Sequence, residues 1–127
     1  MKLTRWDNRK TIHESEHVTI KECVEDAIKH GVSLYRLDLR YANLTGANLR
    51  CVDLRYADLR YAELDYSSWP LWCGSCRVKL DKENNERFAY HAMINMGQKA
   101  LTEFLQNPVE FANRFAERED LKNWGEK

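Results

Sequence analysis

Two cysteines three positions apart are the residues of this chain best suited to chemistry. Cys73 and Cys76 are separated by Gly-Ser, and thiolates at this spacing around a glycine turn can bind one zinc ion. His91 follows after the 14 residues 77–90, a workable distance for a third ligand. Catalytic zinc needs an open coordination position and a neighbouring base, so the pattern favours a structural zinc.

Two other interpretations of the same pair stay open. Cys73 and Cys76 could be inert buried thiols, or they could form a redox pair. No βαβ pattern surrounds them, which argues against a thioredoxin-like role. The nearby Asp81 and Glu83 are better explained as residues that begin a helix. The sequence also shows no nucleophile–base pair, phosphate loop or paired carboxylates, so we expect a protein that is not an enzyme.

Helices are expected on both sides of the centre of the chain. Thr19 and Glu22 form a capping box for a helix over 19–31, and Gly31 suits its end. Its apolar stripe is Ile20, Val24, Ala27 and Ile28. Before it, residues 1–18 predict a short strand or a hairpin with its turn at Asp7-Asn8.

The C-terminal part is also expected to be helical. Asp81 can cap a helix that runs to about Met96, and Gly97 ends it. A second helix is expected over about 98–106, and Pro108 suits the first turn of a third.

Between these helices the sequence repeats every five residues. A period of five fits neither a helix, with 3.6 residues per turn, nor a strand, with a period of 2. Fixed internal repeats instead indicate stacked units that bury a shared core. A small or aliphatic residue stands two positions before each leucine of the series Leu34, Leu39, Leu44, Leu49, Leu54, Leu59 and Leu64.

The pattern A-[DN]-L-x-x over about residues 31–70 closely resembles the pentapeptide-repeat family. The resemblance implies a right-handed quadrilateral β-helix in which each pentapeptide forms one side and twenty residues form a coil. The leucine and the small residue would point inward. We therefore expect a mainly β protein with α-helices: a short β-helix of about two coils, capped by an N-terminal helix and a C-terminal helical segment.

This resemblance also sets the expected domain organisation. Residues 1–30 would form the strand or hairpin and the capping helix, residues 31–70 the β-helix, and residues 71–127 the cysteine knuckle and the C-terminal helices. Together they would make one compact domain. Coils covered at both ends leave no obvious dimer surface, so we expect a monomer.

The implied coil suggests Cys51 as the fourth zinc ligand. With twenty residues per coil, position 51 would lie under position 71, at a strand spacing of about 4.8 Å and close to Cys73. Other candidates are expected at the opposite end of the repeats: His13, His17, His30 and Cys23.

Arginine and tyrosine fill many of the positions that would point outward. Both residue types are enriched in the hot spots of protein interfaces. The alternative is a merely soluble surface, because Asp38, Asp53 and Asp58 lie close to the arginines. The predicted partner-binding face consists of Arg40, Tyr41, Arg55, Tyr56, Arg60 and Tyr61.

The charge balance limits the classes of partner. The chain has 20 basic and 20 acidic residues, whereas proteins that bind nucleic acid usually carry a basic surface. We therefore expect no direct nucleic-acid binding. No run of about 20 apolar residues predicts a membrane helix. The segment LTRWDNRK is too polar for the core of a signal peptide, so a cytoplasmic location is expected.

A further resemblance narrows the function. The stretch W-P-L-W-C-G-S at 69–75 and the triplet A-Y-H at 89–91 look similar to small pentapeptide-repeat proteins of phages and prophages. Some phage proteins of this size inhibit CRISPR effector nucleases. The leading hypothesis is therefore an anti-CRISPR protein in the bacterial cytoplasm that binds a type II effector nuclease and blocks DNA loading or cleavage. The alternatives are a DNA mimic or regulator of a host topoisomerase or other host enzyme, and a zinc-dependent enzyme or redox protein at Cys73 and Cys76.

Overall fold

The computed structural model describes residues 1–70, 73–108 and 110, and of Cys73 it describes the backbone alone. The chain divides into two compact units, Met1–Asn85 and Glu86–Lys127. The first unit contains the hairpin, the first helix and the repeats. Within the described residues no helix combines the length and the apolar composition that crossing a membrane requires.

The first unit begins with a β-hairpin. Strand β1 (Lys2–Thr4) pairs antiparallel with β2 (Thr11–Glu14), and the turn between them contains the predicted Asp7-Asn8. The backbone N–H of Lys10 donates to Oδ1 of Asn8 over 2.9 Å, which closes this connection. An asparagine side chain is well suited to such a local bond.

Helix α1 (Ile20–Lys29) forms where the sequence predicted it. Thr19 is the N-cap, its hydroxyl accepts from the backbone N–H of Glu22 over 3.2 Å, and both halves of the predicted capping box are present. Gly31 follows the helix with φ +70°, a left-handed conformation that glycine adopts at little cost. The helix buries Cys23, Val24 and Ala27.

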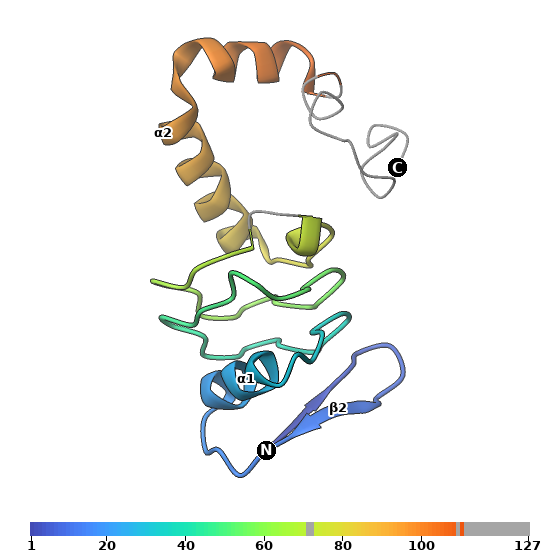
Figure 1. Ribbon diagram of the computed structural model, residues 1–127. Coiled ribbons are helices and arrows are strands. Elements are labelled where there is room, and N and C mark those ends of the chain that lie inside the picture. The colour runs from blue at the N-terminus through green and yellow to red at the C-terminus, as the bar shows by residue number, and fades with distance from the viewer. Residues whose placement is uncertain (71–72, 109, 111–127) are drawn as a thin grey trace. The chain divides into compact units, whose positions relative to one another are not determined.

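The repeats form a β-helix-like stack, visible in Figure 1 as the turquoise and green turns beside α1. Parallel bridges join residues 20 apart in the sequence, for example Asp38 to Asp58 and Asn43 to Glu63. The backbone N–H of Leu39 donates to the carbonyl of Asp58 over 2.9 Å. These bonds satisfy backbone groups that would otherwise be buried without a partner.

The prediction of a mainly β protein overstates the strand content. In the described part of the chain, the repeats contribute isolated bridges, and the regular elements are two α-helices, a two-stranded sheet and a short 3-10 helix at Cys73–Ser75. The physical reason is the frequent corner, because a turn every five residues leaves each side too short for an extended strand. The predicted number of coils stays a prediction.

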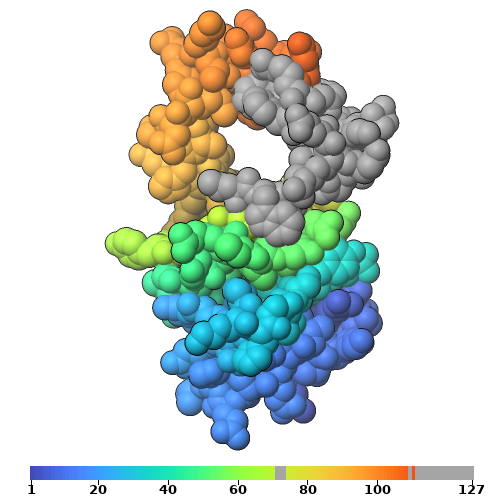
Figure 2. All heavy atoms as spheres, viewed as in Figure 1, coloured from blue at the N-terminus to red at the C-terminus, as the bar shows by residue number. Residues whose placement is uncertain are grey.

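One hydrophobic core runs through the first unit. Every leucine from Leu34 to Leu59 in the five-residue series is buried, and the small residues two positions earlier lie in the same cluster. Leu3 of β1 and Val24 of α1 belong to this cluster too. Figure 2 shows the hairpin and α1, in blue, packed directly against the cyan and green repeats.

The stacking continues beyond the predicted end of the repeats. Asp58 forms a parallel bridge with Lys79, 21 residues away instead of 20, so the chain holds one extra residue before this layer. Val78 and Leu80 pack against the core in the places of the small residue and the leucine. The sequence predicts an end of the repeats near residue 70, because Pro70 stops the regular path, whereas the structure adds this layer after one extra residue.

The corners of the stack have an unusual backbone. The backbone N–H of Ala42 donates to the carbonyl of Leu39 over 3.1 Å, and the residue between them with positive φ is Tyr41. A turn with positive φ at its third residue is a type II turn, where glycine is preferred. Gly46 follows this rule. The corresponding corners with another residue type and positive φ are Arg36, Tyr41, Tyr56, Tyr61 and Tyr66.

Helix α2 (Lys82–Gln106) is broken at Gly97, where φ is 78° and ψ is 162°. The break confirms the prediction that one helix ends at Gly97 and a second covers about 98–106. Oδ2 of Asp81 accepts from the backbone N–H of Asn84 over 3.4 Å at the start of α2. The predicted third helix, from Pro108, falls mainly outside the described residues. The predicted role of these helices as a cover for the coils stays a prediction.

Substitutions at two corners test the cost of the left-handed backbone. Gly46→Ala should lower the free energy of unfolding by about 1–2 kcal/mol, because alanine is strained at φ +71°. Tyr66→Gly should raise it by up to about 1 kcal/mol, because glycine relieves the strain at φ +58° of an exposed side chain. Urea denaturation measures both values.

The control is Thr45→Gly, at the exposed residue directly before Gly46. Glycine there should cost about 0.5–1 kcal/mol, since it only adds freedom to the unfolded chain. A loss of stability in Tyr66→Gly as large as in Thr45→Gly would contradict the assignment of strain to the corners.

Candidate functional site

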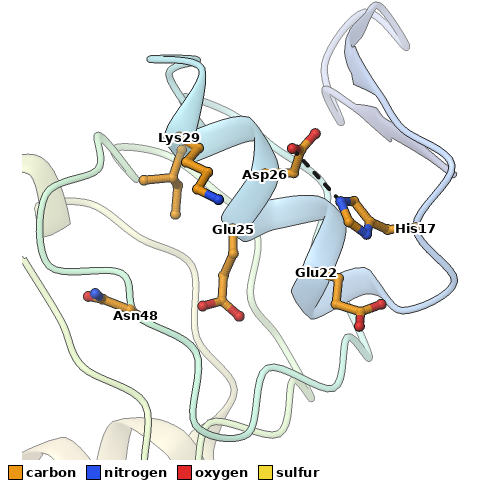
Figure 3. A pocket seen from close by; sticks show the side chains of 7 residues that line it. His17, Glu22, Glu25, Asp26, Lys29 and Asn48 are labelled. Atoms are coloured by element: carbon orange, nitrogen blue, oxygen red, sulfur yellow. Dashed lines mark ion pairs between the residues drawn. The ribbon is translucent and has the colours of Figure 1, made fainter.

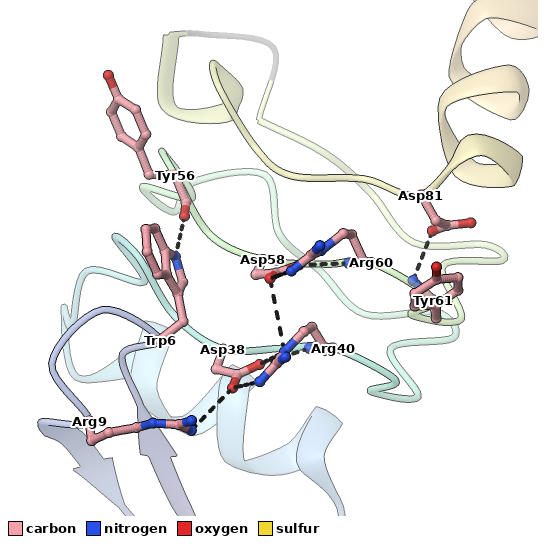
Figure 4. Close-up of polar contacts among 9 residues, drawn as sticks. All are labelled: Trp6, Arg9, Asp38, Arg40, Tyr56, Asp58, Arg60, Tyr61 and Asp81. Atoms are coloured by element: carbon pink, nitrogen blue, oxygen red, sulfur yellow. Dashed lines mark hydrogen bonds and ion pairs between the residues drawn. The ribbon is translucent and has the colours of Figure 1, made fainter.

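Stacked pairs of aspartate and arginine form the most regular feature of the outer surface. Nη2 of Arg40 lies 2.8 Å from Oδ2 of Asp38, and Nη2 of Arg60 lies 2.6 Å from Oδ2 of Asp58. Nε of Arg40 also lies 3.9 Å from Oδ2 of Asp58, which joins the two layers. We call these four residues the Asp/Arg ladder; Figure 4 shows them with their contacts.

The ladder arises from the repeat itself. Oδ1 of Asp58 accepts from the backbone N–H of Arg60 over 3.2 Å and from its Nε over 2.9 Å. An aspartate side chain that accepts from the backbone two residues ahead forms a common local turn, so a unit that carries aspartate followed two residues later by arginine builds its own pair. The same contacts form between Asp53 and Arg55.

The ladder is electrically balanced. Burial raises the pKa of the Asp58 carboxyl, but the hydrogen bonds from Arg60 and the charge of Arg40 outweigh it and leave this pKa below its usual range. The hydrogen bond from Arg40 likewise lowers the pKa of Asp38. All four side chains are therefore charged at neutral pH, and each arginine is held by a carboxylate.

Two stacked tyrosines border the ladder. The ring centroids of Tyr41 and Tyr61 are 5.1 Å apart with an interplanar angle of 14°, as the twenty-residue coil predicted. Their residues are 74% and 59% exposed, so a broad aromatic surface faces the solvent. The backbone N–H of Tyr61 donates to Oδ1 of Asp81 over 2.8 Å, which holds the upper ring's residue in place.

A second aromatic group borders the ladder at the other edge (Figure 4). Nε1 of Trp6 donates to the carbonyl of Tyr56 over 2.7 Å, and Nζ of Lys79 lies 3.5 Å from the centroid of the Trp6 ring. Nη1 of Arg9 lies 3.9 Å from Oδ2 of Asp38. Sequence reasoning missed Trp6 and Arg9, because the hairpin reaches this face only through tertiary packing.

The structure thus brings most of the predicted face together. Arg40, Tyr41, Arg60 and Tyr61 lie on one side of the stack, and Tyr56 lies at its edge. Arg55 pairs with Asp53, with Nη2 and Oδ2 2.9 Å apart. Whether these six residues bind a partner stays a prediction.

The structure tests little of the predicted zinc site. Cys51 is exposed and Cys76 is half-buried in the first unit, whereas His91 is exposed on α2 in the second. The side chain of Cys73 lies outside the described residues. The predicted zinc at Cys73, Cys76, His91 and Cys51 therefore stays a prediction.

Histidines gather around one carboxylate at the hairpin end of the first unit. Nε2 of His13 lies 2.7 Å from Oδ2 of Asp26, and Nδ1 of His30 lies 3.6 Å from Oδ1 of Asp26. Nε2 of His17 lies 3.8 Å from the same Oδ1. We call these four residues the histidine cluster. The hydrogen bond from His13 is the main influence that lowers the pKa of Asp26.

A shallow groove of about 490 Å³ adjoins the cluster along α1. Figure 3 shows His17 and Asp26 at one side of it and Asn48, from the repeats, at the other. From the sequence, His13, His17 and His30 are predicted only as alternative zinc ligands. The spacing of four between Asp26 and His30, which places both on one helix face, is the signal that could have indicated the cluster.

Comparison with known proteins supports the repeat assignment. A family model described as Pentapeptide repeats matches residues 30–66 as eight copies. The chain therefore carries pentapeptide repeats, and proteins with such repeats are often protein-interaction modules. No curated protein and no solved structure gave a match.

Removing one charge of the ladder should weaken the fold. Asp58→Asn should lower the free energy of unfolding at pH 7 by about 1–2 kcal/mol, because Arg60 and Arg40 lose a buried carboxylate while remaining partly hydrated. The pKa of Asp58 is lower in the folded protein, so this contribution is present above about pH 4 and is lost as pH falls further. Urea denaturation between pH 7 and pH 3 measures the difference.

The matched control is Asn48→Asp, at the same place in another repeat. Nε of Arg50 donates to Oδ1 of Asn48 over 3.1 Å at an exposed position, so the substitution should change stability by less than about 1 kcal/mol. An Asp58→Asn effect of the same size at pH 3 and pH 7 would contradict the assigned role of the charge.

Proposed function

We propose that the chain is a non-enzymatic protein–protein interaction module that binds its partner through the Asp/Arg ladder and the flanking tyrosines. The observation that carries this proposal is the exposed stack of Tyr41 on Tyr61 beside the ladder. Large aromatic side chains and arginine contribute most of the binding free energy in many protein interfaces.

The preorganisation of this face supports the proposal. Each ladder arginine is held by at least two hydrogen bonds from its guanidinium to one aspartate. Tyr41 and Tyr61 stand on turns that are bonded to the neighbouring layer. Side chains that are already ordered lose little entropy when a partner binds, so more of the contact energy becomes affinity.

The charge pattern favours a protein over a nucleic acid. Phosphate groups would have to compete with Asp38 and Asp58 for the ladder arginines, and the chain has no net charge. A neutral face with both signs instead suits a partner surface that carries both signs. We therefore propose that the chain does not bind nucleic acid directly.

We propose that the partner protein is a type II CRISPR effector nuclease. This step rests on the similarity of residues 69–75 and 89–91 to small phage and prophage pentapeptide-repeat proteins. A neutral monomer in the bacterial cytoplasm would dock on a protein lobe of the nuclease and block DNA loading or cleavage. The alternatives are a DNA mimic or regulator of a host topoisomerase or other host enzyme, and an enzyme or redox protein at Cys73 and Cys76.

A cleavage assay tests the target and the face together. Purified type II nuclease with guide RNA should lose DNA cleavage in a dose-dependent way as the protein is added. The double variant Tyr41→Gly, Tyr61→Gly should inhibit at least about tenfold less well, because it removes the aromatic stack. Glycine also accepts the left-handed corners, so this variant should keep the fold. A gel shift of the target DNA separates blocked loading from blocked catalysis.

The control is Tyr66→Gly, which removes an exposed corner tyrosine that no described ring contacts. It should inhibit as the wild type does. Full DNA cleavage by several nucleases in a large excess of the protein would show that these nucleases are not its target. A supercoiling assay would then test a host topoisomerase as the partner. Equal inhibition by the double variant and the wild type would show that the partner does not bind through the stacked tyrosines.

We also propose a structural zinc held by Cys73 and Cys76, with His91 and Cys51 as further ligands. The double variant Cys73→Ser, Cys76→Ser should contain one zinc per chain fewer than the purified wild type. Cobalt substitution should give a thiolate charge-transfer band that the same double variant lacks. Because metal binding is coupled to folding in small domains, that variant should also melt at a lower temperature. A wild type that stays folded without thiolate-bound metal would discard this site.

A further inference from the structure

We infer that the histidine cluster is a second metal site, which binds a divalent first-row ion such as zinc through His13, Asp26 and His30. Each of these residues offers a ligand atom, and these atoms all lie within 4.8 Å of one another. Among the side chains that the structure describes, this is the one group of three or more His, Cys, Asp or Glu residues that meets this condition.

The distances in the cluster suit a metal ion. Zinc binds imidazole nitrogen at about 2.0–2.1 Å and carboxylate oxygen at about 2.0–2.2 Å, so tetrahedral ligands lie about 3.3 Å from one another. The nitrogens of His13 and His30 lie 2.7 Å and 3.6 Å from the Asp26 oxygens, on either side of this value. The three ligand atoms, which lie within 4.8 Å of one another, would adjust to this spacing when the ion binds.

The ligands stand on regular elements. His13 comes from β2, Asp26 lies on α1, and His30, four residues after Asp26, is the C-cap of this helix. This spacing of four is the one by which two histidines of a single helix bind zinc. Nδ1 of His30 also donates to the backbone carbonyl of Asp26 over 2.8 Å, so the ring would give up this hydrogen bond and its Nδ1 proton when Nδ1 binds the ion.

A simple ion pair does not account for the arrangement. One histidine already bonds Asp26 at 2.7 Å, yet two more have a ring nitrogen within 3.8 Å of the same carboxylate. The ring centroids of His13 and His30 are also only 5.8 Å apart. A divalent cation instead binds neutral imidazoles and takes up the charge of the carboxylate.

His17 lies beside one of the three ligands, Asp26, and is not part of the group of three. Its Nε2 lies 3.8 Å from Oδ1 of Asp26, and it stands between β2 and α1. The side chains of His17 and His30 are 47% and 64% exposed, which gives the ion access from solvent. The bound ion would tie β2 to α1, and through them the hairpin to the helix that packs on the core.

The test uses the full chain carrying Cys73→Ser and Cys76→Ser, so that the predicted thiolate site is absent. Titration with zinc, followed by calorimetry, should give one equivalent, and cobalt should give a spectrum without a thiolate band. His13→Gln and His30→Gln should each raise the Kd at least about tenfold, because each removes a direct ligand. Zinc should raise the melting temperature of the parent chain but not that of the His30→Gln variant.

Lys29→Gln is the matched control, since it changes the exposed residue directly before His30 and removes no proposed ligand. It should bind zinc as the parent chain does. Absence of zinc binding in the parent chain would overturn the site. Cluster variants that bind zinc as tightly as the parent chain does would overturn it too. His30 is exposed, so its variant should keep the fold, and circular dichroism checks this. Neither outcome depends on the CRISPR target or on the cysteine site.

Discussion

The burial of a leucine at every fifth residue is the constraint on which the rest of the first unit depends. Leu39 and Leu59 are both fully buried, and this fixes the register in which their layers stack. In that register the backbone N–H of Leu39 reaches the carbonyl of Asp58, and Tyr41 lies over Tyr61. The proposed binding face is thus built by the same spacing that builds the core. A change that shifts the core also disorders the face.

The corners show where this architecture costs stability. A left-handed residue other than glycine costs about 1–2 kcal/mol, and Gly46 shows that the repeat accepts glycine at such a corner. At positions 41 and 61 the chain instead carries tyrosine, with φ of 60° and 62°. Tyr66 has the same conformation, with φ of 58°, and no described ring contacts it. The strain therefore belongs to the corners of the repeat, and the exposed stack is what distinguishes Tyr41 and Tyr61.

Sequence reasoning succeeded where the signal is local. The capping box at Thr19, the break at Gly97 and the five-residue period all act over a few neighbouring residues. It failed where distant segments meet. Trp6 reaches Tyr56 across 50 residues, and no spacing in the sequence reports that contact. The gathering of His13 and His30 around Asp26 also depends on how the hairpin packs against α1.

The end of the stack explains how so short a β-helix-like fold can exist. An uncovered last layer would expose backbone groups to pairing with another chain. Here side chains replace the next layer, because Oδ1 of Asp81 accepts from the backbone N–H of Tyr61 and Nδ2 of Asn84 donates to the carbonyl of Ala62 over 3.0 Å. Asn84 is buried at this place and also bonds Asp81. The residues at the start of α2 therefore also bond the backbone of the repeats at Tyr61 and Ala62.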